Sequence, residues 1–374
     1  MPNDIIEMHS TWINVNSIVG CTNGCKYCFL QSTGDNLTKP RIKVSASDAI
    51  NLLFASKYYD EEIPVCLLAN TDPFLNNTNI DYLREMLDLL LVRKVKNPII
   101  LITKCLIPDD FIEYLVKLKK EKIKVVIYLS LSGLGKRYEP NINHDDIKVD
   151  MAKLKLSDIP FIHYYRPFLP SNSKKEDIKK MLDFVSNYTN VSVITGLSLK
   201  SDFINKIDFW DITKKDPVEC LKANSIWPEE AYNYFFKEYD HKQLVFNTNL
   251  CALANKLHKP SPYYETHDCK NYNHCTPEQR KLCAMYKRND KKAILSEIPF
   301  LLKKIGKYDK DLEIIDKGNS LVLKNVNLSA GDCAYLTFML HYKVGIQRKL
   351  VDDHYFNSSL TNSSNFVVKG VSHE

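Results

Sequence analysis

Between residues 12 and 197 the chain alternates apolar, β-branched runs with stretches whose apolar residues recur every three or four positions. The runs predict buried strands, and the spacing between them predicts helices. The predicted strands cover residues 12–19, 63–69, 98–103, 125–131, 159–165 and 191–197, and the predicted helices cover 45–59, 79–94, 109–120, 145–156 and 174–188. Because strands joined by helices run parallel, this order predicts an α/β fold, a partial (β/α)6 TIM-type barrel. Such barrels bind ligands at the carboxyl ends of their strands.

A loop with three cysteines follows the first predicted strand. Cys21, Cys25 and Cys28 are spaced C-x₃-C-x₂-C, and Gly20 and Gly24 suit a backbone that folds closely around a bound group. Thiolates favour soft metals and iron–sulfur clusters, and three cysteines leave one iron of a [4Fe–4S] cube open to an outside ligand. A zinc site would need a fourth ligand at short spacing, and a disulfide would need an oxidising compartment. The loop therefore favours an iron–sulfur cluster.

Polar residues also stand at the carboxyl ends of the next predicted strands. They include Asn70, Thr71 and Asp72 after the second strand, Lys104 after the third, Ser130 at the end of the fourth and Arg166 after the fifth. Each of them alone would suit an ordinary helix cap or turn. Because they share one rim with the cysteine loop, together they predict one binding site.

These motifs resemble the radical SAM superfamily, and residues 20–200 look like its spore photoproduct lyase-like branch, a group often labelled DNA repair photolyases. The matching pieces are Gly-Cys-Thr-Asn-Gly-Cys-Lys-Tyr-Cys (20–28), Asn-Thr-Asp-Pro-Phe (70–74), Ile-Thr-Lys (102–104), Leu-Ser-Leu-Ser (129–132), Glu-Pro (139–140) and Arg-Pro-Phe-Leu-Pro (166–170). The resemblance implies that S-adenosylmethionine binds the open iron and is cleaved to a 5′-deoxyadenosyl radical. It also implies a reductant such as flavodoxin or ferredoxin.

The resemblance gives each matching position a role. It implies that Cys21, Cys25 and Cys28 are the catalytic, cluster-binding residues. For S-adenosylmethionine it implies Tyr27 beside the adenine, Thr71 and Asp72 at the amino end, Lys104 at the carboxylate and Ser130 at the ribose, with Asn70 and Arg166 in the same cofactor-binding set. A zwitterionic cofactor does need an acceptor for its ammonium group and a cation for its carboxylate.

One position departs from the family pattern. Spore photoproduct lyase carries a hydrogen-donating cysteine three residues before the aspartate of the second-strand motif, where this chain has Ala69. The nearby Cys66 falls on the opposite face of the strand, because its offset is odd. The resemblance therefore extends to radical generation and not to the repair of thymine dimers.

A second group of cysteines lies in the C-terminal third. Cys251, Cys269, Cys275 and Cys283 fall within 33 residues. An auxiliary [4Fe–4S] cluster tolerates such irregular spacing and is the interpretation we favour. A zinc site usually shows closely spaced ligand pairs, which are missing, and buried thiols without a metal are the third alternative.

We expect three parts: a radical SAM partial barrel over residues 1–240, a cysteine-rich segment over residues 241–290 and a small α+β module over residues 291–374. In the last part the sequence predicts a helix over residues 293–305, a hairpin turning at residues 317–319 and a helix capped by Ser329. The tail over residues 357–365 is rich in Ser and Asn and is expected to be disordered.

The formal net charge of +6 is concentrated in the C-terminal third. Residues 241–290 carry eight Lys and Arg against four Asp and Glu, and residues 291–374 carry twelve against nine. A solvated face explains such an excess, and so does an anionic partner. The N-terminus lacks a basic and apolar leader, no apolar run approaches the length of a membrane span, and the eleven cysteines are an odd number. We therefore expect a cytoplasmic protein that does not enter a membrane.

The expected function is that of a radical SAM enzyme, of the lyase or oxidoreductase type, that abstracts hydrogen from a substrate over the barrel mouth. The C-terminal positive charge favours a nucleic-acid substrate, since phosphates attract cations and bases stack on aromatic rings. The aromatic residues interleaved with this charge are Tyr263, Tyr264, Tyr272 and Tyr286. Auxiliary clusters are frequent in peptide-modifying relatives, so a peptide or protein substrate is one alternative. A non-catalytic iron–sulfur or zinc-containing binding protein is another.

Overall fold

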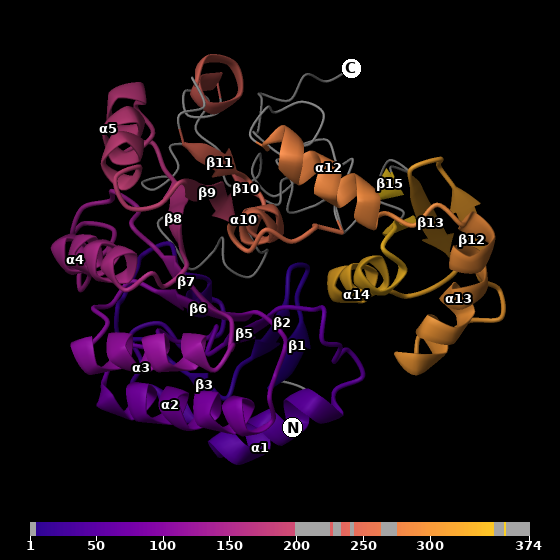
Figure 1. Cartoon of the computed structure of the whole chain (residues 1–374), viewed down its shortest axis with the longest axis horizontal. Coiled ribbons are helices and arrows are strands. Elements are labelled where there is room, and N and C mark those ends of the chain that lie inside the picture. The colour runs from indigo at the N-terminus through magenta and orange to yellow at the C-terminus, as the bar shows by residue number, and fades with distance from the viewer. Residues whose placement is uncertain are drawn as a thin grey trace.

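The computed structural model describes residues 5–198, 225–226, 233–239, 243–262, 275–347 and 355–356. Its centre is a nine-stranded sheet in which six neighbouring strands run parallel, as the alternation predicts. In spatial order these strands are β2 (Ile13–Val15), β5 (Val65–Leu67), β6 (Ile99–Thr103), β7 (Val125–Leu129), β8 (Phe161–Phe168) and β9 (Val191–Ser198). Strands adjacent in the sheet follow one another along the chain, so the sheet winds into a partial barrel (Figure 1).

Three further strands extend this sheet at its edges. β1 (Ile6–Met8) pairs antiparallel with β2, and β10 (Ser225–Ile226) pairs antiparallel with β9. β11 (Leu244–Phe246) pairs parallel with β9. A seventh parallel strand therefore comes from beyond the six predicted ones, in the segment just before the second cysteine group.

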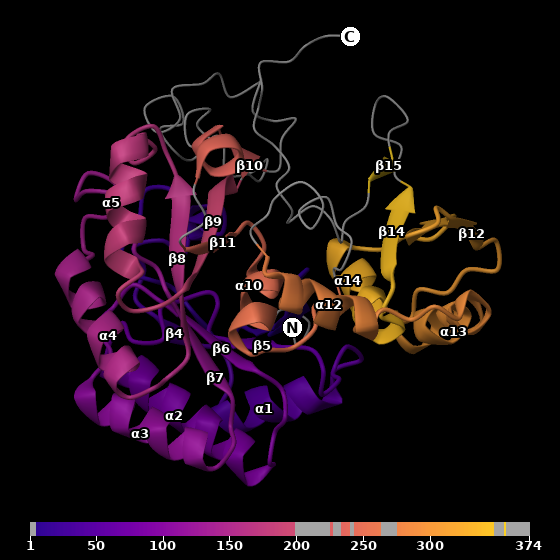
Figure 2. The ribbon, with the colours of Figure 1, turned by 45° about the horizontal axis from the view of Figure 1, so that its top comes forward.

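Five helices cover the outside of the parallel sheet, as Figure 2 shows: α1 (Ala46–Ala55), α2 (Asn77–Val92), α3 (Asp109–Lys120), α4 (His144–Leu156) and α5 (Lys175–Val185). The strands between them are apolar because both of their faces are covered, and every residue of β7 is buried. The side chain of Ser45 caps α1 by accepting a hydrogen bond from the N–H of Asp48. The helix expected to reach Tyr59 ends at Ala55, because Ser56 has an extended backbone.

The first predicted strand, residues 12–19, is divided in two. After β2 the chain leaves the sheet at Asn16, whose N–H donates to the carbonyl of Ile5 at 2.7 Å. It then forms β3 (Ile18–Val19), which pairs antiparallel with β4 (Arg41–Ile42). This turn away from the sheet places the cysteine loop, which begins at Cys21, over the end of the barrel rather than in line with its strands.

The C-terminal part forms a second sheet, in the order β12 (Glu313–Asp316), β13 (Ser320–Lys324), β14 (Lys343–Gln347) and β15 (Tyr355–Phe356). β12 and β13 form the predicted hairpin. Three helices accompany this sheet and lead into it: α12 (Pro277–Tyr286), α13 (Lys291–Lys304) and α14 (Ala330–Leu340). α14 begins with a capping box between Ser329 and Asp332, which confirms the predicted cap.

α14 packs directly on the barrel. A Cβ atom on Gly331 would lie 1.8 Å from the carbonyl oxygen of Met8 in β1, so the helix and the edge strand touch through backbone. Buried apolar residues of both parts join in one cluster. In the described ranges, no helix combines the length and the apolar character needed to cross a bilayer. The Ser- and Asn-rich tail over residues 357–365 lies outside the described residues.

Candidate functional site

A cavity of about 200 Å³ opens at the carboxyl ends of the parallel strands. Its walls are the cysteine loop and residues at the ends of β5, β6, β7, β8 and β9. Of the ten barrel residues predicted to hold a cluster and a cofactor, nine line it: Cys21, Cys25, Tyr27, Cys28, Thr71, Asp72, Lys104, Ser130 and Arg166. The tenth, Asn70, supports the loop through its carbonyl oxygen, which accepts a hydrogen bond from the N–H of Gly20 at 3.2 Å.

The two glycines of the cysteine loop are required by its geometry. Gly20 has a φ of +107°, and a Cβ atom there would lie 2.7 Å from the carbonyl oxygen of Lys39. Gly24 has a φ of +68°, and a Cβ atom there would lie 2.5 Å from a methyl carbon of Leu37. The close approach expected from the sequence is therefore an approach of the loop to the 35–39 segment of its own chain.

Hydrogen bonds fix the cysteine loop on two sides. On one side, the N–H of Leu37 donates to the carbonyl of Cys21 at 2.8 Å. On the other, the N–H of Lys26 donates to the carbonyl of Tyr138 at 2.9 Å, and the Asn141 amide donates to the carbonyl of Thr22 at 2.8 Å. The loop is thus held between its own return segment and the loop that follows β7.

The three thiols of the loop are sheltered from solvent. Cys21 and Cys25 are buried and Cys28 is half-buried. Burial, with a smaller contribution from Asp72, raises the pKa of Cys21 to about 12, and burial likewise raises the pKa of Cys25 to about 12. Without a metal, burial therefore favours the protonated thiols. A bound metal centre reverses this preference, because coordination deprotonates a thiol and releases its proton.

A single metal ion and a cubic cluster place different demands on the three thiols. In the described parts of the chain, no three His, Cys, Asp or Glu side chains meet closely enough to hold one metal ion. A cubic cluster has a different requirement, since each cysteine binds a different iron. Three thiols that line one cavity match the number of protein ligands that leaves one iron of a cubic cluster open.

Glu139 is the centre of a buried polar network beside the cavity. Its side chain is fully buried, and its Oε1 lies 2.7 Å from the Lys104 Nζ and also accepts a hydrogen bond from the Tyr27 hydroxyl. Its Oε2 accepts from the Ser132 hydroxyl at 2.6 Å and pairs with the His144 Nε2 at 2.6 Å. The carboxylate thus joins the cysteine loop to the ends of β6 and β7 and to the start of α4.

This network keeps Glu139 ionised. Burial alone would raise the pKa of its carboxyl group, but the charge of Lys104 and the hydrogen bonds from His144, Lys104 and Ser132 outweigh burial and lower the pKa to about 2. Lys104 also donates to the carbonyl of Ser130 at 3.3 Å. An ammonium group has three N–H donors, so Lys104 retains one for a ligand in the cavity that it lines.

Asp72 is a second buried carboxylate in the wall of the cavity. It accepts hydrogen bonds from the backbone N–H of Lys104 at 2.8 Å, the Thr103 hydroxyl at 2.7 Å and the Asn23 amide at 3.4 Å. Burial raises its pKa despite these bonds. Because the ammonium group of Lys104 is directed to Glu139 instead, Asp72 has no ion pair among the described residues, and a cationic ligand in the cavity would stabilise its charge.

Arg166 of β8 also lines this cavity and forms a wall with its neighbours. It donates a hydrogen bond to the Tyr164 hydroxyl, and its guanidinium carbon lies 4.6 Å from the centre of that ring. Tyr164 and Gly196 line the same cavity, from β8 and β9. This wall supplies a cation and an aromatic face rather than further acidic groups.

Sequence reasoning missed three of these residues. Glu139 belongs to a quoted motif but received no role, because its partners lie far apart in the sequence and only the fold brings them together. Asn23 lies inside the cysteine motif, between two ligand positions, and Tyr164 lies two residues before Arg166. Their place beside predicted site residues was the only signal that could have identified them.

Two members of the second cysteine group, Cys251 and Cys283, both contact Ser261. The Cys283 sulfur accepts hydrogen bonds from the backbone N–H of Ser261 at 3.2 Å and from the Gln279 amide at 3.4 Å, and the Cys251 sulfur lies 3.8 Å from the Ser261 hydroxyl. Cys275 is half-buried against the apolar cluster. Cys269 lies outside the described residues, as do Tyr263, Tyr264 and Tyr272.

Comparisons with known proteins give structural matches alone. No protein-family model matches the chain, and no curated protein matches it. Among solved structures, the chain is similar to spore photoproduct lyase complexed with dinucleoside spore photoproduct, with a TM-score of 0.44 and 13% identity over 57% of this chain and 66% of that one. It is also similar to a radical SAM methyltransferase from Sphaerobacter thermophilus, with a TM-score of 0.39 and 14% identity over 52% of this chain and 59% of that one.

A third match is SuiB of Streptococcus suis bound to S-adenosylmethionine, with a TM-score of 0.42 and 17% identity over 62% of this chain and 48% of that one. The chain spans less than two thirds of the length of each of these three structures.

Proposed function

We propose that this chain is a radical SAM enzyme, which cleaves S-adenosylmethionine reductively and abstracts hydrogen from a substrate at the mouth of the barrel. One observation carries the proposal: Cys21, Cys25 and Cys28 face the same cavity as Asp72 and Lys104. That arrangement puts a three-thiol site for a cluster beside a buried anion and a half-buried cation. Each of the three features has a partner in the cluster or in the zwitterionic cofactor.

The proposed division of roles follows from the chemistry of the donors. Cys21, Cys25 and Cys28 would hold a [4Fe–4S] cluster, which would leave one iron open for S-adenosylmethionine. When bound, the reduced cluster and S-adenosylmethionine supply an electron and a cleavable carbon–sulfur bond, from which the hydrogen-abstracting radical arises. The surrounding residues of the chain bind and orient the cofactor.

For S-adenosylmethionine, Asp72 with Thr71 accepts from the amino group, while Asn70 supports the cysteine loop from outside the cavity. Lys104 donates its remaining N–H to the carboxylate. Ser130 bonds the ribose, Tyr27 lies along the adenine, and Arg166 with Tyr164 forms a wall. In this scheme Glu139 touches no reacting atom and acts as a positioning residue, since it holds both Lys104 and Tyr27.

Electron paramagnetic resonance of the anaerobically reconstituted, reduced protein tests the open iron. We expect the signal of a [4Fe–4S] cluster, changed by added S-adenosylmethionine, because an open iron gains a ligand. Cys25→Ala should lack this change, whereas Cys66→Ala, a matched loss of a fully buried thiol outside the cavity, should keep it. A signal that S-adenosylmethionine leaves unchanged in the unaltered protein would contradict the proposal.

For the substrate we propose nucleic acid, supported by the excess of Lys and Arg over Asp and Glu in residues 241–374. A peptide or protein substrate is the competing proposal, supported by the second cysteine group. Incubation in deuterated solvent with nucleic acid or with peptide pools separates the two, because only a true substrate stimulates formation of 5′-deoxyadenosine and acquires the label. A non-catalytic binding protein would form none with either.

A further inference from the structure

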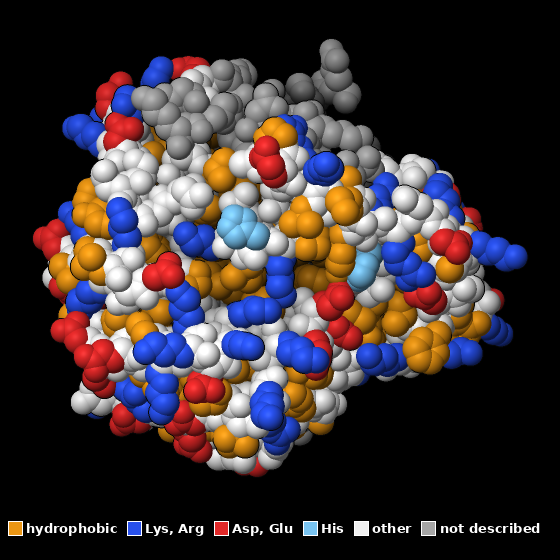
Figure 3. All heavy atoms as spheres, viewed as in Figure 1, with side chains coloured by type: hydrophobic (Ala, Val, Ile, Leu, Met, Phe, Trp, Pro, Cys, Tyr) orange, Lys and Arg blue, Asp and Glu red, His pale blue; other side chains and the backbone are white. Residues whose placement is uncertain are grey.

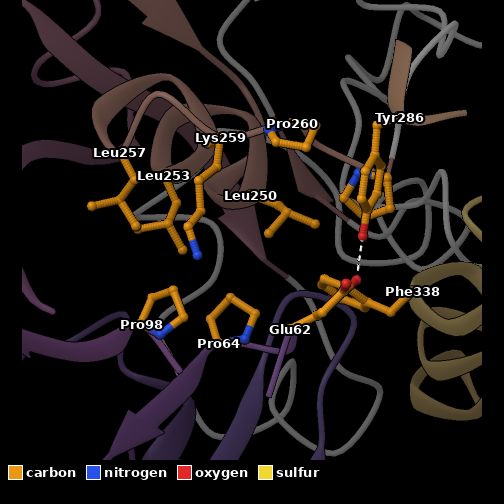
Figure 4. Close-up of a pocket in the computed structure, with 12 residues that line it drawn as sticks. Glu62, Pro64, Pro98, Leu250, Leu253, Leu257, Lys259, Pro260, Tyr286 and Phe338 are labelled. Atoms are coloured by element: carbon orange, nitrogen blue, oxygen red, sulfur yellow. Dashed lines mark hydrogen bonds between the residues drawn. The ribbon is translucent and has the colours of Figure 1, made fainter. Parts of the chain in front are cut away.

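A second, largely apolar cavity of about 230 Å³ lies at the other end of the barrel, between the strands and the C-terminal part of the chain. Pro64 and Pro98, which immediately precede β5 and β6, form one of its walls. Leu250 and Leu253 from α10 (Asn249–Lys256) form another, and Phe338 of α14 closes it (Figure 4). The cysteine loop lies at the opposite ends of the same strands, so this cavity is separate from the proposed active site.

The wall formed by Pro64 and Pro98 has its backbone polar groups already paired or missing. Proline has no N–H, and both proline carbonyls are already used in the sheet. The carbonyl of Pro64 accepts from the N–H of Ile13 at 2.9 Å, and that of Pro98 accepts from the N–H of Val65 at 2.8 Å. Only apolar ring atoms therefore face an occupant from these two residues, and the leucines opposite add more apolar surface.

One edge of the cavity carries Lys259, and Lys124 of a neighbouring cavity lies close to it. Lys259 lines the cavity, and its side chain reaches toward Pro98 in Figure 4. Its backbone is fixed, since its N–H donates to the carbonyl of Ala254 at 2.9 Å and its carbonyl accepts from the Gln279 amide at 2.6 Å. Lys124, which precedes β7, comes within hydrogen-bonding reach of the Lys259 side chain. Burial lowers the pKa of Lys259, and the charge of Lys124 lowers it further.

The charge of Glu62 raises the pKa of Lys259 but does not outweigh burial and the charge of Lys124. Glu62 lines the same cavity at the opposite side, where it accepts a hydrogen bond from the Tyr286 hydroxyl (Figure 4). It also accepts one from the His341 ring at 3.0 Å. Within the described residues, neither Lys124 nor Lys259 forms an ion pair. Lys124 is exposed and Lys259 is half-buried, so water screens part of their repulsion, and an anion placed between them relieves the rest.

The positive charge continues beyond the pair. A neighbouring cavity of about 340 Å³ shares Leu257 with the first and is lined by Lys119, Lys122 and Lys124. Lys119 is paired with Asp158, which leaves Lys122 and Lys124 without an acidic partner in the described chain. Figure 3 shows Lys and Arg side chains gathered along the middle of this face, beside a hollow in which apolar side chains are visible.

We propose that this cavity binds a small organic anion, with an apolar body against Pro64, Pro98 and Leu253 and an acidic group between Lys124 and Lys259. A carboxylate, sulfonate or phosphate monoester would satisfy the two ammonium groups equally. The occupant belongs to a site distinct from the cysteine loop, so this inference does not rest on the proposed function.

Two fluorescent probes that share one skeleton test the proposal. Anilinonaphthalene sulfonate is an apolar body with one anionic group, and phenylnaphthylamine is nearly the same body without it. We expect one molecule of the sulfonate to bind per folded chain, about tenfold more tightly than the neutral probe, because charge-assisted hydrogen bonds discriminate by this order.

Substitutions of the two lysines test whether the sulfonate probe binds at this cavity. Lys259→Met and Lys124→Met should each weaken sulfonate binding about tenfold, while the affinity of the neutral probe stays the same. Lys259→Glu should weaken it further, and retained binding of the neutral probe shows that the cavity is still formed. Lys292→Met, which removes an exposed lysine of α13, is the matched control and should change neither affinity. Equal affinities for the two probes, no binding of either, or unaltered sulfonate binding by both methionine variants would overturn the proposal.

Discussion

The Lys104 Nζ and the Glu139 Oε1 lie 2.7 Å apart, with the lysine side chain 15% exposed and the glutamate side chain fully buried. Neither charge is therefore independent of the other. A buried ion pair stabilises little overall, but the loss of one partner leaves a charge uncompensated, at a cost of about 3–5 kcal/mol. This pair fixes the place of the lysine that we assign to the cofactor carboxylate, and it also dictates how that assignment must be tested.

The first prediction concerns Lys104. Lys104→Met should weaken binding of S-adenosylmethionine roughly ten- to a hundredfold, the value of one charge-assisted hydrogen bond. This change also leaves the buried carboxylate of Glu139 without its ion-pair partner. The double variant Lys104→Met/Glu139→Gln removes both charges and therefore isolates the effect on cofactor binding. We expect the double variant to keep its iron and most of its stability yet to bind the cofactor as weakly as the single variant.

Lys96→Met is the control for this experiment, since Lys96 and Glu61 form an exposed ion pair on the surface. It should alter stability by less than about 1 kcal/mol and leave cofactor binding unchanged. Equilibrium binding that is as tight in the double variant as in the unaltered protein would show that Lys104 does not hold the carboxylate.

The second prediction concerns Gly20. Gly20→Ala imposes about 1–2 kcal/mol of backbone strain and also a contact with the carbonyl oxygen of Lys39, 2.7 Å away. We expect reconstituted Gly20→Ala to carry less iron per chain, because the segment at 35–39 must move away from the loop. Iron analysis after reconstitution measures this directly.

Substitutions at two other glycines separate the effect of backbone strain from the effect of the clash. Gly34 has a φ of +78° with open space around its Cβ position, so Gly34→Ala imposes strain without a clash. Gly135 has open space as well and no positive φ, so Gly135→Ala should be harmless. Iron content equal in Gly20→Ala and Gly135→Ala would refute the importance of the close approach.

The third prediction is a pH dependence set by Asp150 in α4. Burial raises the pKa of this carboxyl group to about 7, although the N–H of Ile107 donates to it at 2.9 Å. The folded chain therefore holds a proton that the unfolded chain releases near pH 4, so this residue destabilises the fold increasingly as the pH rises from about 4 to about 7.

Asp150→Asn removes that titration. Relative to the unaltered protein, its free energy of unfolding should rise by on the order of 2 kcal/mol between pH 5 and pH 8, as measured by urea denaturation. Asp81→Asn, at an exposed position of α2, should show no such trend. A stability difference that does not depend on pH would mean that Asp150 titrates normally.

The barrel was predictable because its signals are local. Each parallel strand is a continuous apolar run, and Asp72 and Lys104 stand directly after two of these runs, so their position on one rim follows from the order of the elements. The division of the first strand was not predictable. It depends on the pairing of Ile18 with Ile42, a contact whose apolar residues look the same whether the strand continues or turns.

The role of Glu139 and the pairing of Lys124 with Lys259 could not be predicted from the sequence, for a different reason. The sequence around Glu139 resembles that of a surface loop. Its contacts with Tyr27, Lys104 and His144, which stabilise it as a buried anion, appear only in the folded chain. Lys124 and Lys259 are separated by the whole second half of the barrel, and each alone resembles a solvated lysine. Periodicity does not encode such long-range electrostatic contacts.

The fourth prediction concerns the second cysteine group, which we propose to hold an auxiliary cluster of its own. The shared contact of Cys251 and Cys283 with Ser261 supports this proposal. A protein with Cys21, Cys25 and Cys28 all changed to alanine should still bind about four irons and four sulfides per chain. It should cleave no S-adenosylmethionine.

The complementary variant, without Cys269, Cys275 and Cys283, should lose that iron and become less stable, because binding energy in a metal-dependent segment is also folding energy. Zinc in the first variant would make the group a structural zinc site. An absence of both metals would mean that these thiols are only packed in the core.

The most direct test of the account is the release of 5′-deoxyadenosine by the reduced, anaerobically reconstituted protein supplied with S-adenosylmethionine. We predict that the unaltered protein and Cys66→Ala both release it and that Cys25→Ala releases none. Undiminished 5′-deoxyadenosine from Cys25→Ala, or none from the unaltered protein carrying a full and reduced cluster, would contradict the assignment of the cysteine loop as a radical SAM site.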